Sequence, residues 1–154
     1  MKNRILKISG VLIVSMCLSA TWLTSAWTGE RTGLESRVPA EELEQVKAIK
    51  LPFPLTKDFV AKGKALYEGK AFCSACHGLD GTGRQMNVRS PLHAGPSPTN
   101  FGDAAWQAAR SNGELFWILK HGSHGTDMTS YLPLFLTEEE AWQIVTYIRS
   151  FGKS

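Results

Sequence analysis

Apolar residues beyond position 56 recur at intervals of three and four, the period of an amphipathic helix. Four segments follow this pattern, and the last three begin after a residue type that caps helices. They are 57–71, 104–110 after Asp103, 113–120 after Asn112, and a final segment opened by the capping box Thr137-Glu138-Glu139-Glu140. The inward-facing residues would be Phe59, Gly63, Leu66 and Tyr67, then Leu115, Phe116 and Leu119, then Trp142, Ile144, Val145 and Ile148. No stretch alternates long enough for a convincing strand, so the pattern predicts a small all-α domain over residues 57–154.

The segment 29–56 is charged and punctuated by proline. Residues 39–49 predict a short helix, because Pro39 would stand at its first position and acidic residues fill its first turn. Residues 51–55 should be extended, because a residue that precedes proline avoids the helical region. This segment, called the arm below, would either pack on the domain, reach a partner or act as a passive linker.

Residues 1–28 are typical of a targeting segment. Lys2, Arg4 and Lys7 form a positive start, and residues 8–28 are an uncharged run with a small-residue cleavage site at residues 24–26. The run is also long enough to span a bilayer, so a retained membrane anchor competes with a cleaved signal peptide. Either interpretation predicts export of the remaining chain to the periplasm or the outer face of the cytoplasmic membrane.

The charge of the exported part follows from this division. Three of the 17 Lys and Arg residues lie in residues 1–28, and the other 14 equal the 14 Asp and Glu residues. The exported part is therefore formally neutral, which gives no indication of a nucleic-acid partner.

The candidate chemistry lies in Phe72-Cys73-Ser74-Ala75-Cys76-His77-Gly78. A redox dithiol would need a preceding strand, and a structural zinc site would need further Cys or His ligands at similar spacing. The remaining cysteine, Cys17, lies in the apolar N-terminal run, so a four-cysteine zinc site is excluded. A disulfide is possible outside the cytoplasm, but Cys-x-x-Cys-His is the attachment signature of covalent haem, with His77 as ligand of the iron.

The opposite face of a haem iron needs a second ligand. The candidates are Met86, His93, His121, His124 and Met128. Met86 follows the motif too closely for the chain to round the porphyrin edge, whereas Met128 comes 51 residues after His77, in a glycine-rich stretch. We therefore expect Met128, with His121 or His124 as alternatives that would lower the redox potential, or else an open site.

Four elements together, FCSACHGLDGTG, PSPTNF, GTDM and LTEEEAWQIVTYIRSF, make residues 57–152 similar to the class I mono-haem cytochrome c family. The resemblance implies an all-α fold wrapped around one covalent haem c, with the first and last helices crossing at Gly63 and Tyr67 against Tyr147. It also implies that a proline carbonyl, from Pro96 or Pro98, fixes the second nitrogen of the proximal histidine.

The resemblance implies electron transfer, not catalysis, with redox proteins as donor and acceptor and possible membrane contact through residues 8–28. The chain would be a carrier or an electron-transfer subunit whose arm docks to a redox enzyme. The alternative is a haem enzyme or gas sensor in which Met128 is absent from the iron or easily displaced.

Overall fold

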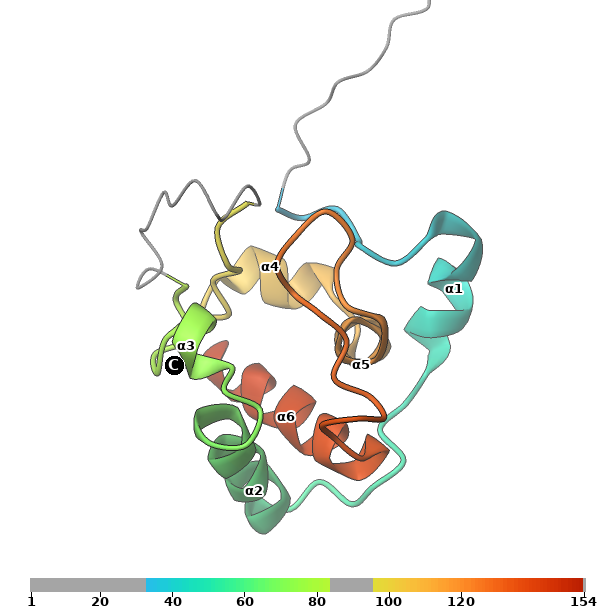
Figure 1. The fold of residues 1–154 in the computed structure, drawn as a ribbon. Helices are drawn as coiled ribbons and strands as arrows, with labels where there is room; N and C mark the ends of the chain where they lie inside the picture. The colour runs from blue at the N-terminus through green and yellow to red at the C-terminus, as the bar shows by residue number, and fades with distance from the viewer. Residues whose placement is uncertain (1–32, 84–95, 154) are drawn as a thin grey trace, which may run out of the picture. The chain divides into compact units, whose positions relative to one another are not determined.

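The computed structural model describes residues 33–83 and 96–153, and these residues belong to one compact unit. Within these ranges the chain forms six α-helices and no strand (Figure 1). They are α1 (Ala40–Ala48), α2 (Lys57–Glu68), α3 (Ser74–His77), α4 (Ala104–Ala109), α5 (Asn112–His121) and α6 (Glu138–Phe151). None of the helices in the described ranges is long and apolar enough to cross a membrane. The predicted all-α fold is confirmed; the predicted signal or anchor, residues 1–28, lies outside the described residues.

Side-chain caps explain where four of the helices begin. Thr56 caps α2, Asp103 caps α4 and Thr137 caps α6, each by accepting a hydrogen bond from the backbone three residues on. At α5 the prediction was off by one residue, because Ser111 is the cap and Asn112 is the first helical residue. Ser111 and Glu114 form a reciprocal capping box, the same device that Thr137 forms in α6.

Helices α2 and α6 pack directly against each other, as Figure 1 shows in green and red. Gly63 lies at their contact, where an added Cβ would come within 2.0 Å of the Gln143 carbonyl oxygen. Tyr67 meets Tyr147 edge-on, with the ring centroids 5.2 Å apart. The crossing that the family resemblance implied is therefore present.

The main core lies between α2, α5 and α6 and the loops that join them. Tyr67, Leu136, Ile144 and Val145 are its largest fully buried side chains. Phe116 of α5 stacks on Trp142 of α6, with a centroid separation of 4.6 Å and nearly parallel rings. The inward-facing residues expected in α6, Trp142, Ile144, Val145 and Ile148, are all buried.

The described part of the arm, residues 33–56, lies on the domain surface. Its helix α1 packs against α5 (Figure 1). The extended stretch that follows places Phe53 against Phe59 of α2, with ring centroids 5.6 Å apart, while Leu55 stays exposed. Of the alternatives left open by the sequence, packing on the domain is the one the structure shows.

Candidate haem-binding site

The Cys-x-x-Cys-His motif follows α2 after a sharp change of chain direction. Phe72, in the left-handed region at φ 52°, precedes Cys73, and the short helix α3 then carries residues 74–77. The His77 amide donates to the Cys73 carbonyl at 2.9 Å, which is the i to i+4 pairing of a helical turn. Cys73 and His77 are therefore neighbours one helical turn apart, with Cys76 between them in the sequence, as expected.

The two cysteines differ in their surroundings and are not joined by a disulfide. Cys73 is buried and belongs to the main core, and this burial raises the pKa of its thiol to about 12. Cys76 is exposed. One sulfur thus faces the core and the other faces outward.

His77 is held in one orientation and one tautomer. Its Nδ1 lies 3.2 Å from the Thr99 carbonyl oxygen, and because a carbonyl can only accept, Nδ1 carries the proton. Nε2 therefore keeps its lone pair. Burial lowers the pKa of His77, which favours the neutral form that a metal-ligating imidazole needs. The Phe101 ring stacks on it with centroids 4.3 Å apart and fixes its plane.

The partner of Nδ1 corrects the expectation of a proline carbonyl from Pro96 or Pro98. The Pro98 carbonyl instead packs against Gly83, where an added Cβ would lie 2.3 Å from its oxygen. Thr99, one residue further along the chain, presents its carbonyl to the imidazole. The second-nitrogen contact exists, but from Thr99.

Met128 lies in the loop between α5 and α6, and its backbone is tied to the end of α5. The Ser123 amide donates to the Met128 carbonyl at 2.8 Å. Gly122, at φ 78°, passes so close that an added Cβ would lie 2.8 Å from the same carbonyl oxygen. The Met128 side chain is partly buried and packs against the main core.

The competing ligands are placed differently. His121 and His124 are both exposed, and the His121 ring lies against Trp117, with centroids 4.6 Å apart. Met86 and His93 lie outside the described residues. Among the candidates that the structure describes, Met128 is the one packed against the core that also contains Cys73.

Tyr131 brings the Met128 loop and the motif together. Its side chain is partly buried and packs against the main core, which also contains Cys73, and this burial raises the pKa of Tyr131. Its amide donates to the Leu119 carbonyl of α5 at 2.8 Å. Met128 and the segment just after it therefore pack against the same core as Cys73.

Three contacts at this site were not predicted: Thr99 and Phe101 on the imidazole, and a hydrogen bond of 2.8 Å from the Tyr67 hydroxyl to the Gly78 carbonyl. Phe101 belongs to the PSPTNF stretch that the sequence singled out, so an aromatic residue was visible there. The sequence could not predict that this ring stacks on His77, because the stacking depends on the path of the intervening loop.

The donor set fits a covalently attached haem. Two thiols at this spacing can form thioethers, and an adjacent neutral imidazole with a free Nε2 lone pair can ligate iron. Within residues 33–83 and 96–153, no group of three or more His, Cys, Asp and Glu side chains is gathered to hold a metal ion by itself.

A family model matches the part of the chain that contains this donor set. Residues 60–152 match the family model described as Cytochrome c. A chain of the Kuenenia stuttgartiensis reducing HAO-like protein complex Kustc0457/Kustc0458 is 25% identical, with a TM-score of 0.56, over 66% of this chain and 47% of that one. The chain thus spans less than half of that relative's length. The KustC0563 c-type cytochrome is 28% identical, with a TM-score of 0.44, over 58% of this chain and 95% of its own. No curated protein sequence matches the chain.

Proposed function

Because this chain belongs to the cytochrome c family, which carries haem c covalently and serves electron transfer, we propose that it binds one haem through Cys73 and Cys76 with His77 and Met128 as axial ligands. When bound, the haem supplies an iron that cycles between the ferrous and ferric states. With both axial positions filled, the chain would be an electron carrier or an electron-transfer subunit.

The observation that carries this proposal is the contrast between the candidate ligands. The His77 ring is hydrogen-bonded at Nδ1 and stacked on Phe101, so its other nitrogen is held in place. Met128 has its backbone fixed at the end of α5 and its side chain against the core, whereas His121 and His124 are exposed. Two positioned ligands favour electron transfer, because the site then rearranges little between oxidation states.

Replacement of Met128 by alanine tests the proposal. In the haem-loaded wild type, ferric protein should show the weak sulfur-to-iron band at the red end of the spectrum, and ferrous protein should bind carbon monoxide poorly. Met128→Ala should abolish the band, open the site to carbon monoxide and lower the potential, because sulfur ligation favours ferrous iron. Met86→Ala is the matched control and should change none of these.

The same measurements distinguish the alternative. If wild-type ferrous protein takes up carbon monoxide readily and stoichiometrically, the carrier proposal is wrong and a haem enzyme or gas sensor with a displaceable sixth ligand replaces it.

We further propose that the domain works outside the cytoplasmic membrane, in the periplasm or on the outer membrane face, with redox proteins as donor and acceptor. The targeting character of residues 1–28 supports the location. The similarity to a chain from a redox protein complex supports a partner of that class. Co-purification from native membranes would identify the donor and acceptor.

A further inference from the structure

The arm is attached to α5 by a small apolar cluster separate from the main core. Val38, Val46 and Trp117 are its buried members, and Leu43 and Ile118 pack against them; this group is called the arm cluster below. Trp117 also donates from Nε1 to the Glu42 carboxylate of α1 at 3.0 Å. The arm therefore covers one side of α5, while Phe116 stacks on α6 on another.

The backbone of the arm touches α5 at Gly113. A Cβ added there would lie 1.9 Å from the Val46 carbonyl oxygen and 3.1 Å from Ile49 Cβ. The two helices can be this close only because position 113 has no side chain. Alanine at 113 would therefore push α1 away, while α5 itself would gain a better helix-forming residue.

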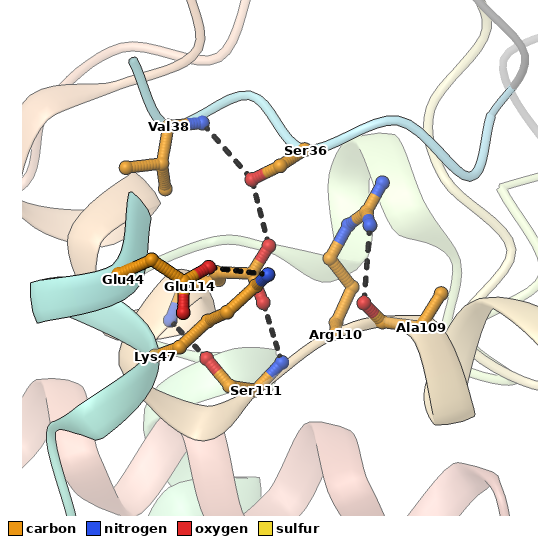
Figure 2. Close-up of polar contacts among 8 residues, drawn as sticks. All are labelled: Ser36, Val38, Glu44, Lys47, Ala109, Arg110, Ser111 and Glu114. Atoms are coloured by element: carbon orange, nitrogen blue, oxygen red, sulfur yellow. Dashed lines mark hydrogen bonds and ion pairs between the residues drawn. The ribbon is translucent and has the colours of Figure 1, made fainter. Parts of the chain in front are cut away.

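Hydrogen bonds extend the contact between the arm and α5 toward residue 33 (Figure 2). The Ser36 hydroxyl donates to Glu114 Oε1 at 2.7 Å, and the other carboxylate oxygen accepts from the Ser111 amide, also at 2.7 Å. The Arg110 guanidinium donates to the backbone carbonyls of residues 33, 34 and 35. The start of the arm is thus hydrogen-bonded to the start of α5.

The opposite end of α5 sets the position of Met128. The Ser123 amide, two residues after the helix, donates to the Met128 carbonyl, and Gly122 passes close to the same oxygen. The Leu119 carbonyl of α5 accepts from the Tyr131 amide. A shift of this end of α5 would therefore move the backbone at Met128 and at Tyr131, three residues after it.

From this arrangement we propose that the arm is a clamp that immobilises α5 and, through it, the loop that presents the Met128 sulfur. The inference rests on the proposed function, since it assumes that Met128 ligates the iron. Loosening the clamp raises the fraction of molecules in which the loop opens and Met128 leaves, so an external ligand enters more often.

The first test compares two glycine substitutions in the full-length, haem-loaded protein. Gly113→Ala displaces the arm, whereas Gly33→Ala is the matched control, because it keeps the backbone carbonyl that Arg110 binds and its added Cβ meets nothing within 4 Å. With imidazole as the probe, the ferric Gly113→Ala protein should bind about tenfold faster than wild type, as expected when a packed interface is disrupted. Gly33→Ala should behave as wild type.

A second, milder pair of variants tests the clamp if the Gly113→Ala protein does not fold. Glu42→Ala removes the acceptor of Trp117, whereas Glu44→Ala removes only the pairing with Lys47 inside α1. Imidazole should bind about threefold faster to Glu42→Ala, and the Ser123 amide should exchange its hydrogen faster by a similar factor. Glu44→Ala should change neither rate.

The outcomes separate the two proposals. A wild-type protein without the sulfur-to-iron band would overturn Met128 ligation and the clamp with it. A wild-type protein with the band, but with Gly113→Ala and Glu42→Ala binding imidazole at the wild-type rate, would overturn the clamp alone. Contacts with α6, such as that of Phe116 with Trp142, would then suffice to hold α5.

Discussion

The Tyr67 hydroxyl connects the helix crossing to the haem-binding motif. It is completely buried and donates to the carbonyl of Gly78, the residue after His77. The same carbonyl also accepts from the Gly81 amide at 3.2 Å, so Tyr67→Phe removes one of two hydrogen bonds, and a hydrogen bond contributes about 0.5–1.5 kcal/mol net. We expect a loss of this size in the free energy of unfolding of the haem-loaded protein, measured in guanidinium chloride. Tyr147→Phe, at a partly exposed ring in the same aromatic group, should cost less than about 0.5 kcal/mol.

Glu114 makes the stability sensitive to acid. Burial by itself would raise its pKa, but hydrogen bonds from Ser111 and Ser36 and the charge of Arg110 outweigh burial and lower it. A carboxylate with a lowered folded-state pKa stabilises the protein above its unfolded value of about 4.5, and this stability is lost as the pH falls through the folded-state value.

Glu114→Gln should therefore destabilise the protein at pH 7 by about 1.5–3 kcal/mol, the range for hydrogen bonds to a charged group. The difference from wild type should shrink as the pH falls below about 4.5. Thermal unfolding across a pH series measures both effects. A difference that stays constant from pH 7 to pH 3 would contradict the role given to the carboxylate.

At single positions, the sequence predicted what depends on residue type and missed what depends on backbone direction. The spacing of Cys73, Cys76 and His77 is enough to predict covalent haem attachment. Which carbonyl faces His77 depends on the path of residues 96–101, so Thr99 could not be distinguished from its proline neighbours.

Among the helices, the crossing of α2 and α6 depends on Gly63. Gly63→Ala would place a methyl group 2.0 Å from the Gln143 carbonyl oxygen, which is backbone and cannot rotate away. Overpacking of this kind costs about 1–3 kcal/mol or more, so the melting temperature of the haem-loaded protein should fall clearly. Gly102→Ala is the control, because its nearest neighbour is the movable Asn100 side chain at 3.3 Å. Equal melting temperatures for the two variants would contradict the close contact at Gly63.

Helix positions followed from periodicity and caps, while helix partners did not. The capping box at Thr137 and the apolar positions of α6 predicted that helix directly. The docking of α1 on α5 depends on Gly113 and on a tryptophan–carboxylate hydrogen bond between residues 75 apart. Hydrophobic periodicity reveals neither feature, so the sequence alone left several roles open for the arm.

For the molecule as a whole, the single attachment motif and residues 1–28 each lead to a prediction. The intact mass of native protein should exceed that of the processed polypeptide by one haem, and acidic acetone should not extract the pigment.

N-terminal sequencing should find a chain that begins near Trp27, or one that retains residues 8–28 and stays with the membrane. A haem-free chain in the cytoplasm would contradict both versions.

The docked arm also bears on how the protein behaves in concentrated solution. A fragment that begins at residue 57 would lack Val38 and Val46, the arm residues that cover Trp117. An uncovered aromatic patch promotes self-association, so the fragment should dimerise or precipitate at concentrations where the chain from residue 29 stays monomeric. Light scattering coupled to size exclusion would show the difference, and Trp117→Lys in the fragment should restore the monomer. If the fragment without this substitution is also monomeric, exposure of Trp117 does not cause self-association and the prediction is wrong.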